Sequence, residues 1–326
     1  MTQNKIGLAW IKEHFSLDGI QIDTECFTAK ISSINNKDKQ RHIYPESYRP
    51  KNTVVDQLKF AFKYEPLNLR CFSDLFKKPS VDKEIEIALN LNPGGKYNRL
   101  MGFYYEFLTK KSLNVKKLTA GNYIDAINKD KYYVAPSIKE RKFRVNNNLT
   151  GNSMLTMLIK RDEHLLKDND LKRMLIESVS EYPVEFLDRA TRYLISKETK
   201  SSNAIEAENI SPNKLVKFIF ALETINDEEL TKEQLISTLN IIKDKHYHEF
   251  DYRYEQNYLG DSGFNYIGSI DYVTPKPSDV HELMDEWFLV RDRVLHSDMP
   301  SIAKAAALSS SFVFIHPFID GNGRIS

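Results

Sequence analysis

The segment "FIHPFIDGNGRIS" runs from Phe314 to Ser326. It brings together a histidine, an aspartate, two glycines around an asparagine, and an arginine within nine residues. Pro317 cannot continue the interior of a helix, so a helix that reaches His316 must end there. The sequence therefore predicts a helix end that holds an imidazole beside a glycine-containing loop.

The residues before His316 predict that helix. Pro300 suits the first turn of a helix, and apolar or small residues then recur three or four positions apart. These residues are Ile302, Ala305, Ala306, Ser309, Phe312 and Val313. Small side chains allow neighbouring helices to approach closely, so we expect a buried helix within a bundle. That helix would hold His316 on a rigid support.

The loop after the helix combines several kinds of chemistry. Asp320 is a hard oxygen ligand of the type that Mg²⁺ shares with substrate phosphates. The glycines in residues 321–323 let consecutive backbone N–H groups turn toward an anion, and Arg324 offers a planar fork of donors for a phosphate. His316, with an ordinary histidine pKa of about 6.5, is a natural general base for a hydroxyl. Together these groups predict phosphoryl or nucleotidyl transfer.

A purely structural interpretation of the same stretch is a corner between two helices, with a capping aspartate and a glycine turn. Such a corner needs neither a histidine nor an arginine at fixed offsets. The stretch instead resembles the signature of the Fic family, H-P-F-x-[D/E]-G-N-G-R-x-x-R. The matching positions are His316, Pro317, Phe318, Asp320, Gly321, Asn322, Gly323 and Arg324.

The resemblance implies a mainly α fold, a Fic-type helical bundle with a β-hairpin flap. It implies a protein adenylyltransferase that moves AMP from ATP to a serine, threonine or tyrosine hydroxyl of a target protein. His316 would be the catalytic base, and Asp320 would hold Mg²⁺. The nucleotide-binding residues would be Gly321, Asn322, Gly323 and Arg324.

The segment "SSNAIEAEN" (201–209) lies upstream on a predicted helix. Ser202 and Glu206 are four positions apart, so they share a helix face. The segment resembles the inhibitory motif [S/T]-x-x-x-E-[G/N] of some Fic proteins, although Ala207 departs from its last position. The resemblance implies that Glu206 blocks productive binding of the ATP γ-phosphate. The alternative is an exposed helical carboxylate without such a role.

The segment "YRYEQNYLGDSGFNYIGSIDYVTPKP" (252–277) predicts a β-hairpin, because aromatic and β-branched residues surround its glycines. It resembles the flap of the family, which adds the target segment as an edge strand through backbone hydrogen bonds. Tyr272 and Val273 would then lie on the strand that faces the target. The alternative is a surface hairpin that binds nothing.

Composition limits the partners. The 46 basic and 45 acidic residues leave a formal charge of +1, so neither nucleic acid nor an anionic membrane is expected as a partner. Cys26 and Cys71 are too few for a disulfide framework, which favours the cytoplasm. No apolar run approaches the length of a membrane span. The expected partners are ATP and a protein bearing a hydroxyl side chain, and a homo-oligomer stays open.

Two domains are expected. Residues 1–165 would form a mixed α/β N-terminal domain of unknown function, and residues 166–326 a Fic domain with its inhibitory helix. In the family the inhibitory glutamate pairs with the second arginine of the signature. That arginine falls one position after Ser326, so the expected partner of Glu206 is not in this sequence. We therefore expect the Fic domain to be C-terminally incomplete in this sequence.

Two other functions remain open at this point. One is a catalytically inactive regulatory module that binds a nucleotide or a partner on the same fold. The other is nucleic-acid regulation through the basic run "KERKFRVNNN" (139–148), which predicts salt-dependent DNA binding. A solvated surface is the simpler interpretation of that run.

Overall fold

The computed structural model describes most of the chain. The described residues are 3–162, 165, 168–179, 182–183, 185–186, 189–190, 192–194, 196–197, 216, 230–243, 245–260 and 270–326. The chain divides into two compact units. The N-terminal unit covers Met1–Arg161 with His296–Asp298, and the C-terminal unit covers Asp162–Leu295 with Met299–Ser326.

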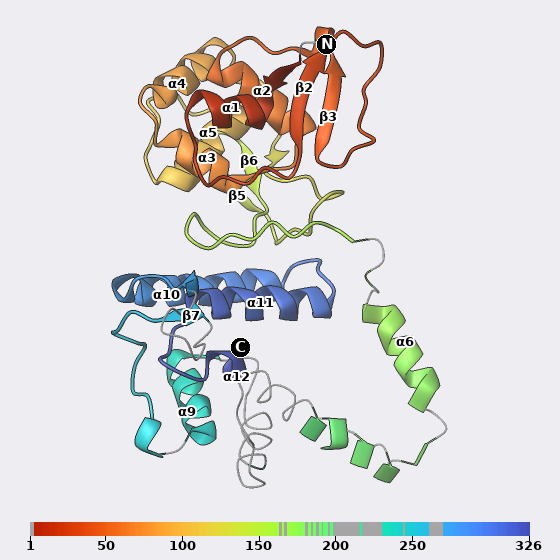
Figure 1. The fold of residues 1–326 in the computed structure, drawn as a ribbon, viewed down its shortest axis with the longest axis vertical. Coiled ribbons are helices and arrows are strands. Elements are labelled where there is room, and N and C mark those ends of the chain that lie inside the picture. The colour runs from red at the N-terminus through yellow and green to blue at the C-terminus, as the bar shows by residue number, and fades with distance from the viewer. Residues whose placement is uncertain are drawn as a thin grey trace. The chain divides into compact units, whose positions relative to one another are not determined.

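The N-terminal unit combines helices with small mixed sheets (Figure 1). Its helices are α1 (Gly7–His14), η1 (Glu46–Tyr48), α2 (Val54–Tyr64), α3 (Leu69–Phe76), α4 (Val81–Leu91) and α5 (Lys96–Thr109). Its strands are β1 (Asn4–Ile6), β2 (Glu25–Ala29), β3 (Arg41–Pro45), β4 (Ile124–Asp125), β5 (Ile138–Glu140) and β6 (Val145–Asn147). β2 pairs antiparallel with β1 and parallel with β3, while β6 pairs parallel with β4 and antiparallel with β5. This confirms the predicted mixed character.

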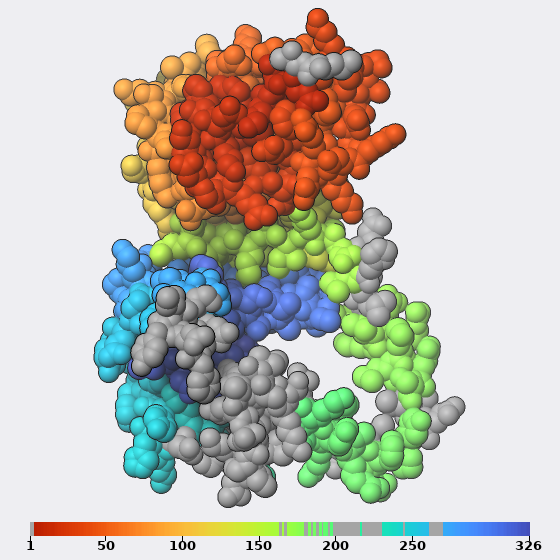
Figure 2. Space-filling view, viewed as in Figure 1, coloured from red at the N-terminus to blue at the C-terminus, as the bar shows by residue number. Residues whose placement is uncertain are grey.

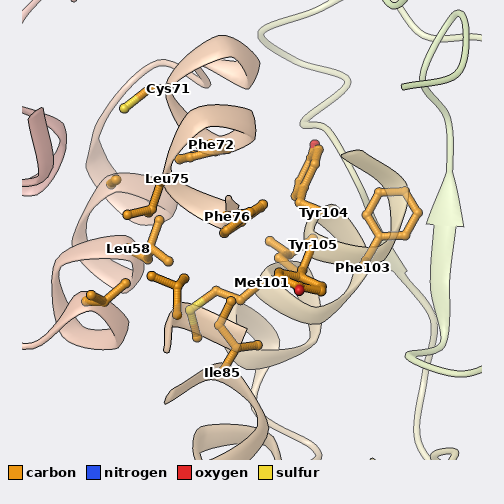
Figure 3. Packing of buried hydrophobic residues seen from close by; sticks show 14 of the residues in the cluster. Leu58, Cys71, Phe72, Leu75, Phe76, Ile85, Met101, Phe103, Tyr104 and Tyr105 are labelled. Carbon is orange, nitrogen blue, oxygen red and sulfur yellow. The ribbon is translucent and has the colours of Figure 1, made fainter. Parts of the chain in front are cut away.

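An aromatic core holds the helices of this unit together (Figure 3). Phe72 and Tyr104 are fully buried, and each ring packs against Phe62, with centroid distances of 4.9 and 5.6 Å. The Tyr104 hydroxyl donates to the Ala126 carbonyl at 2.9 Å. Burial of one such aromatic ring contributes about 1.5–3 kcal/mol, so these rings favour the packing of α2, α3 and α5 against one another. The space-filling view shows α1, β2 and β3 closely packed on one face (Figure 2).

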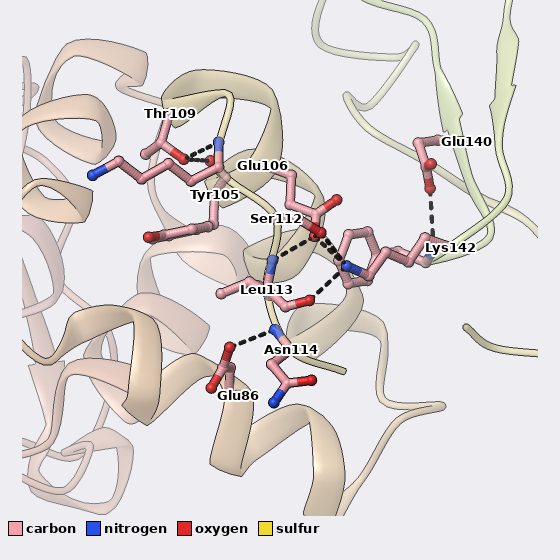
Figure 4. A network of polar contacts seen from close by, with 11 residues as sticks. Glu86, Tyr105, Glu106, Thr109, Ser112, Leu113, Asn114, Glu140 and Lys142 are labelled. Carbon is pink, nitrogen blue, oxygen red and sulfur yellow. Dashed lines mark hydrogen bonds and ion pairs between the residues drawn. The ribbon is translucent and has the colours of Figure 1, made fainter. Parts of the chain in front are cut away.

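A polar network closes the loop after α5 (Figure 4). The Glu106 carboxylate accepts hydrogen bonds from the Leu113 N–H at 2.8 Å and from the Ser112 hydroxyl at 3.3 Å, and it pairs with the Lys142 ammonium. Lys142 also donates to the Leu113 carbonyl at 2.7 Å. The Lys142 ammonium therefore stabilises this loop, although Lys142 belongs to the basic run of residues 139–148.

The C-terminal unit is mainly helical, with one pair of antiparallel strands among its described residues. Its helices are α6 (Asp168–Val179), α9 (Lys232–Ile242), η3 (Lys245–Tyr247), α10 (Pro277–Leu295), α11 (Ser301–Ile315) and α12 (Asn322–Ile325). The strands are β7 (Tyr258–Gly260) and β8 (Ile270–Val273). Together they confirm the predicted helical fold with a strand pair beside it. A search of the described helices finds none that could cross a membrane.

The helices α10 and α11 lie side by side (Figure 1). The Trp287 ring of α10 meets Phe312 of α11 edge-on, with centroids 5.3 Å apart, and its Nε1–H donates to the Ser311 hydroxyl at 3.0 Å. The predicted buried stripe of α11 is confirmed at Phe312 but wrong at Ile302, Ala305 and Ala306, which are exposed. The buried residues of the helix are Ala307, Ser311, Phe312 and Ile315, and two of them, Ser311 and Phe312, contact Trp287 of α10.

Candidate active site

His316 ends α11 in an unusual backbone conformation. Its N–H still donates to the Phe312 carbonyl at 2.9 Å, but its φ of 54° and ψ of 59° lie in the left-handed region. Helices often end on such a residue, which is usually glycine because a Cβ makes the conformation costly. A histidine there stores strain of about 1–3 kcal/mol, and strain of this kind concentrates at functional sites. The position thus favours a chemical role for the side chain.

The imidazole is oriented by its own helix. Its Nδ1 lies 3.3 Å from the Val313 carbonyl, and a carbonyl can only accept, so Nδ1 carries the proton. Nε2 then presents a lone pair. Burial lowers the pKa of His316, and the nearby charge of Arg253 acts in the same direction, while the Val313 bond and Asp320 oppose them. The side chain is therefore suited to accept a proton near neutral pH.

The backbone around His316 is bound by β8 and by the segment just before β7. The Tyr272 hydroxyl of β8 donates to the Phe314 carbonyl at 2.7 Å, and its ring lies beside that of Phe314, with centroids 5.8 Å apart. The Asn257 side-chain amide donates to the Phe318 carbonyl at 3.3 Å. The strand pair and the loop are therefore joined on both sides of His316.

Arg253 supplies the bonds between these two contacts. It is only 2% exposed, and its Nε donates to the His316 carbonyl at 2.7 Å. Its backbone N–H donates to the Pro317 carbonyl at 2.8 Å. Arg253 could not be predicted from the sequence, because a single arginine in an aromatic segment belongs to no spacing that marks a site.

Phe318 and Asn322 hold the loop in shape. The Phe318 ring is fully buried and packs against Tyr252 and Phe312. The Asn322 amide is buried and engages the Phe318 backbone twice: it accepts from the N–H at 2.9 Å and donates to the carbonyl at 2.8 Å. Asn322 is thus an internal brace of the loop, and its contact with a nucleotide stays a prediction.

Gly321 is required by both conformation and space. Its φ is 88°, and a Cβ at this position would lie 2.7 Å from Leu239 Cδ1 on α9. Within residues 321–323 only Gly321 has a left-handed backbone, since Asn322 and Gly323 begin α12. The backbone N–H groups of residues 321–323 were predicted to turn toward an anion. In the structure Gly321 makes a turn that leads into the first turn of α12, whose N–H groups have no acceptor within the helix.

Asp320 and Arg324 form an ion pair across that turn. Arg324 Nη2 donates to Asp320 Oδ2 at 2.8 Å, with the arginine side chain 4% exposed and the aspartate 59% exposed. An exposed carboxylate fits Mg²⁺, which often takes one or two protein carboxylates together with substrate phosphates. The part of the chain that the structure describes contains no group of three or more acidic, histidine or cysteine side chains that could hold a metal. A cation at Asp320 stays a prediction.

The remaining predicted residues fall into two groups. Tyr258 pairs with Val273 and Leu259 with Tyr272, with an irregularity before Gly260. Val273 is 61% exposed, whereas the Tyr272 hydroxyl is turned to α11. Their contact with a target stays a prediction. Ser202 and Glu206, which are predicted to be inhibitory, lie outside the described residues.

This arrangement defines a class of protein: a helical domain that places a histidine at a helix end, a glycine turn into a second helix, and a strand pair beside both. Residues 229–326 match the model of the Fic/DOC family, and this part of the chain is a Fic domain. The family predicted from the sequence is thereby confirmed. A search of curated proteins finds no match to the chain.

Proposed function

We propose that the protein is a Fic-type adenylyltransferase that transfers AMP from ATP to a serine, threonine or tyrosine hydroxyl of a target protein. A Fic domain indicates a group-transfer enzyme in general, and the site residues supply the finer assignment. One observation carries it: Nδ1 of His316 is bound to the Val313 carbonyl, which leaves Nε2 as an oriented proton acceptor.

In the proposed reaction the target hydroxyl oxygen attacks the α-phosphorus of ATP. His316 Nε2 takes the hydroxyl proton, the new O–P bond forms, and the bond between the α-phosphorus and the bridging oxygen breaks. Pyrophosphate leaves with that electron pair. Because burial keeps the pKa of His316 low, the imidazole starts the reaction neutral.

The loop residues would bind the nucleotide. Asp320 would hold Mg²⁺, which supplies charge neutralisation on the phosphates when bound. The first-turn N–H groups of residues 322–324 would donate to phosphate oxygens. Arg324 would neutralise the leaving pyrophosphate, which requires its fork to share or leave Asp320, because Nη2 is bound there. Val273 and the β8 edge would receive the target strand.

The proposal predicts that the purified protein with Mg²⁺ and ATP labelled at the α-phosphate labels itself or a protein in a lysate. His316→Ala should lower the labelling rate by about 100-fold or more, since general-base catalysis supplies at least that factor. ATP binding, followed by calorimetry, should stay within about threefold, because the imidazole contacts the target and not the phosphates. A mass spectrum of the labelled protein should show one AMP per modified hydroxyl.

His14→Ala in the N-terminal unit is the matched control and should label like the unchanged protein. Loss of ATP binding in His316→Ala would contradict the role as base. Glu206→Gly belongs in the same assay, because the proposed inhibitory role of Glu206 predicts more labelling after its removal. Absence of labelling from both the unchanged protein and Glu206→Gly would reject the enzyme.

The second candidate is a module on the same fold that binds a nucleotide or a partner and transfers nothing. It is favoured by three internal bonds, two that engage the Asn322 amide and one that engages the Arg324 fork. Calorimetric binding of ATP with Mg²⁺, in the absence of any transfer to a lysate protein, would select this function.

Nucleic-acid regulation through residues 139–148 receives less support. Lys142 is paired with Glu106, and the Arg144 guanidinium lies over the Tyr123 ring and donates to the Gly121 carbonyl at 2.6 Å. These two cations of the run have internal partners, which leaves fewer charges for phosphates.

A further inference from the structure

Five consecutive carbonyls, those of residues 314–318, accept hydrogen bonds from β8 and from the segment just before β7. We call this set of contacts the carbonyl clamp. The donors are the Tyr272 hydroxyl to Phe314, Arg253 Nη2 to Ile315, Arg253 Nε to His316, the Arg253 N–H to Pro317, and the Asn257 amide to Phe318. The last carbonyls of a helix lack partners within it, so such donors are needed at a buried helix end.

Arg253 is the centre of the clamp because its guanidinium also binds the segments before β7 and after β8. Its Nη1 donates to the Glu255 carbonyl at 2.9 Å and its Nη2 to the Pro275 carbonyl at 2.6 Å. Glu255 precedes β7 and Pro275 follows β8, so one guanidinium joins the segments that enter and leave the strand pair to His316. The planar fork makes these bonds in several directions at once, which a lysine ammonium on a flexible stem cannot reproduce.

A second set of bonds stiffens the same junction. The Thr274 hydroxyl donates to the Asn257 backbone at 2.7 Å, and the Gln256 side-chain amide donates to the Thr274 carbonyl at 2.9 Å. Because Asn257 also reaches Phe318, this set continues the clamp beyond Arg253. The segments before β7 and after β8 are therefore tied to each other as well as to the loop.

We propose that Arg253 is a positioning residue that fixes the His316 loop and the strand pair as one unit, so that a target strand on β8 presents its hydroxyl to the imidazole. The expected effect on the transfer rate rests on the proposed function, whereas the hydrogen bonds of Arg253 do not depend on it. Arg253 contacts carbonyls only, so it acts through His316 and not on the substrate. Its loss should therefore disturb the alignment of the reacting groups more than nucleotide binding.

The test compares Arg253→Lys with Arg99→Lys in the full chain. Arg99 is a matched control, because it is a buried arginine of the N-terminal unit that also donates to backbone carbonyls, those of Phe143 and Asn122. We expect Arg253→Lys to lower kcat for target transfer by about 100-fold, the effect of a misplacement of about 1 Å. The KM for ATP should change by less than about threefold, and Arg99→Lys should keep both constants.

Tyr272→Phe is a milder variant of the same clamp, used in case Arg253→Lys does not fold. It removes one hydrogen bond and should lower kcat by about tenfold, again without a change in the KM for ATP. An unchanged kcat in Arg253→Lys, or an equal loss in Arg99→Lys, would overturn the proposal. So would a higher KM for ATP at constant kcat, since that would place the effect in nucleotide binding.

Amide hydrogen exchange tests the geometry without any transfer. In Arg253→Lys, residues 252–260 and 314–323 should lose protection together, while the helices of the N-terminal unit keep theirs. If the unchanged protein transfers nothing, the proposed function fails, and hydrogen exchange alone decides the role of Arg253. Unchanged protection of residues 314–323 would then overturn it.

Discussion

At the scale of single residues, His316 combines a costly backbone with an oriented ring. Its left-handed conformation would suit glycine better, and the half-buried ring is held by Val313 three positions earlier. Strain that a glycine would relieve indicates that the side chain is needed at this position. Gly321 differs, since a Cβ at its φ of 88° would be strained and would also have to displace the end of the Leu239 side chain. At His316 the side chain is kept in spite of a strained backbone, whereas at Gly321 the backbone favours the residue that has no side chain.

The pKa of His316 leads to a prediction about pH. Burial lowers this pKa below its ordinary value of 6.5, so the imidazole stays neutral at pH values where an exposed histidine would be charged. A protonated base cannot accept the hydroxyl proton, so activity should fall only when the pH drops below 6.5. The acid limb of kcat/KM for target transfer measures this pKa in the free enzyme. A midpoint at or above the ordinary value would contradict the predicted direction.

At the scale of elements, the site depends on how α10 holds α11. Trp287 is buried against Phe312, and its indole N–H is satisfied by the Ser311 hydroxyl and the Leu308 carbonyl. This contact lies just over one helical turn before His316, so it determines how the end of the helix is directed. The carbonyl clamp then holds the same end from the side of the strand pair.

Ser311→Ala should lower the free energy of unfolding of the C-terminal unit by about 1 kcal/mol, because a buried hydrogen bond to Trp287 is lost. Ser310→Ala is the matched control: Ser310 is exposed and its hydroxyl bonds only within its own helix, to Ala306. Its removal should be neutral or slightly stabilising, since alanine favours the helix. Urea unfolding followed by Trp287 fluorescence in a Trp10→Phe background measures both, and equal effects would argue against the contact.

At the scale of the whole molecule, each unit has its own core and its own buried polar group. In the N-terminal unit the Glu65 carboxylate accepts from the Leu8 N–H at 2.9 Å, at the start of α1. A Cβ on Gly7 would meet Glu65 Oε1 at 2.4 Å, so the chain uses glycine there. Burial raises the pKa of Glu65 from 4.5 to about 7, against the opposing effects of the Leu8 bond and Cys26.

This pKa predicts how the stability of the N-terminal unit depends on pH. Between pH 4.5 and about 7 the folded state holds the Glu65 proton while the unfolded state releases it, so stability falls as the pH rises through this window. Glu65→Gln keeps an acceptor for Leu8 and should flatten that fall. Trp10 fluorescence in a Trp287→Phe background follows the unit during urea unfolding. Equal pH dependence with and without Glu65→Gln would show that the carboxyl does not titrate in this window.

Much of the candidate site could be predicted because its residues are contiguous. His316, Asp320 and Arg324 fall within one short segment, and local spacing is enough to predict a helix end, a turn and their chemistry. Local rules also predict the helix that leads to His316, which the structure has as α11 over Ser301–Ile315. The hydrogen bonds of the Asn322 amide to the Phe318 backbone and the ion pair of Asp320 with Arg324 could not be predicted from the sequence. Side-chain partners depend on how the loop closes.

The order of the residues was therefore enough to predict the family of residues 229–326, the helical character of the C-terminal unit and the candidate reactive groups. Tertiary structure alone decided which face of α11 meets α10, and which residues hold the loop that carries His316. Arg253 acts from 63 positions away, and Tyr272 bonds to Phe314 from 42 positions away. Both bind backbone carbonyls, which every residue possesses. No pattern of side chains marks such an acceptor, so only the folded chain reveals the clamp.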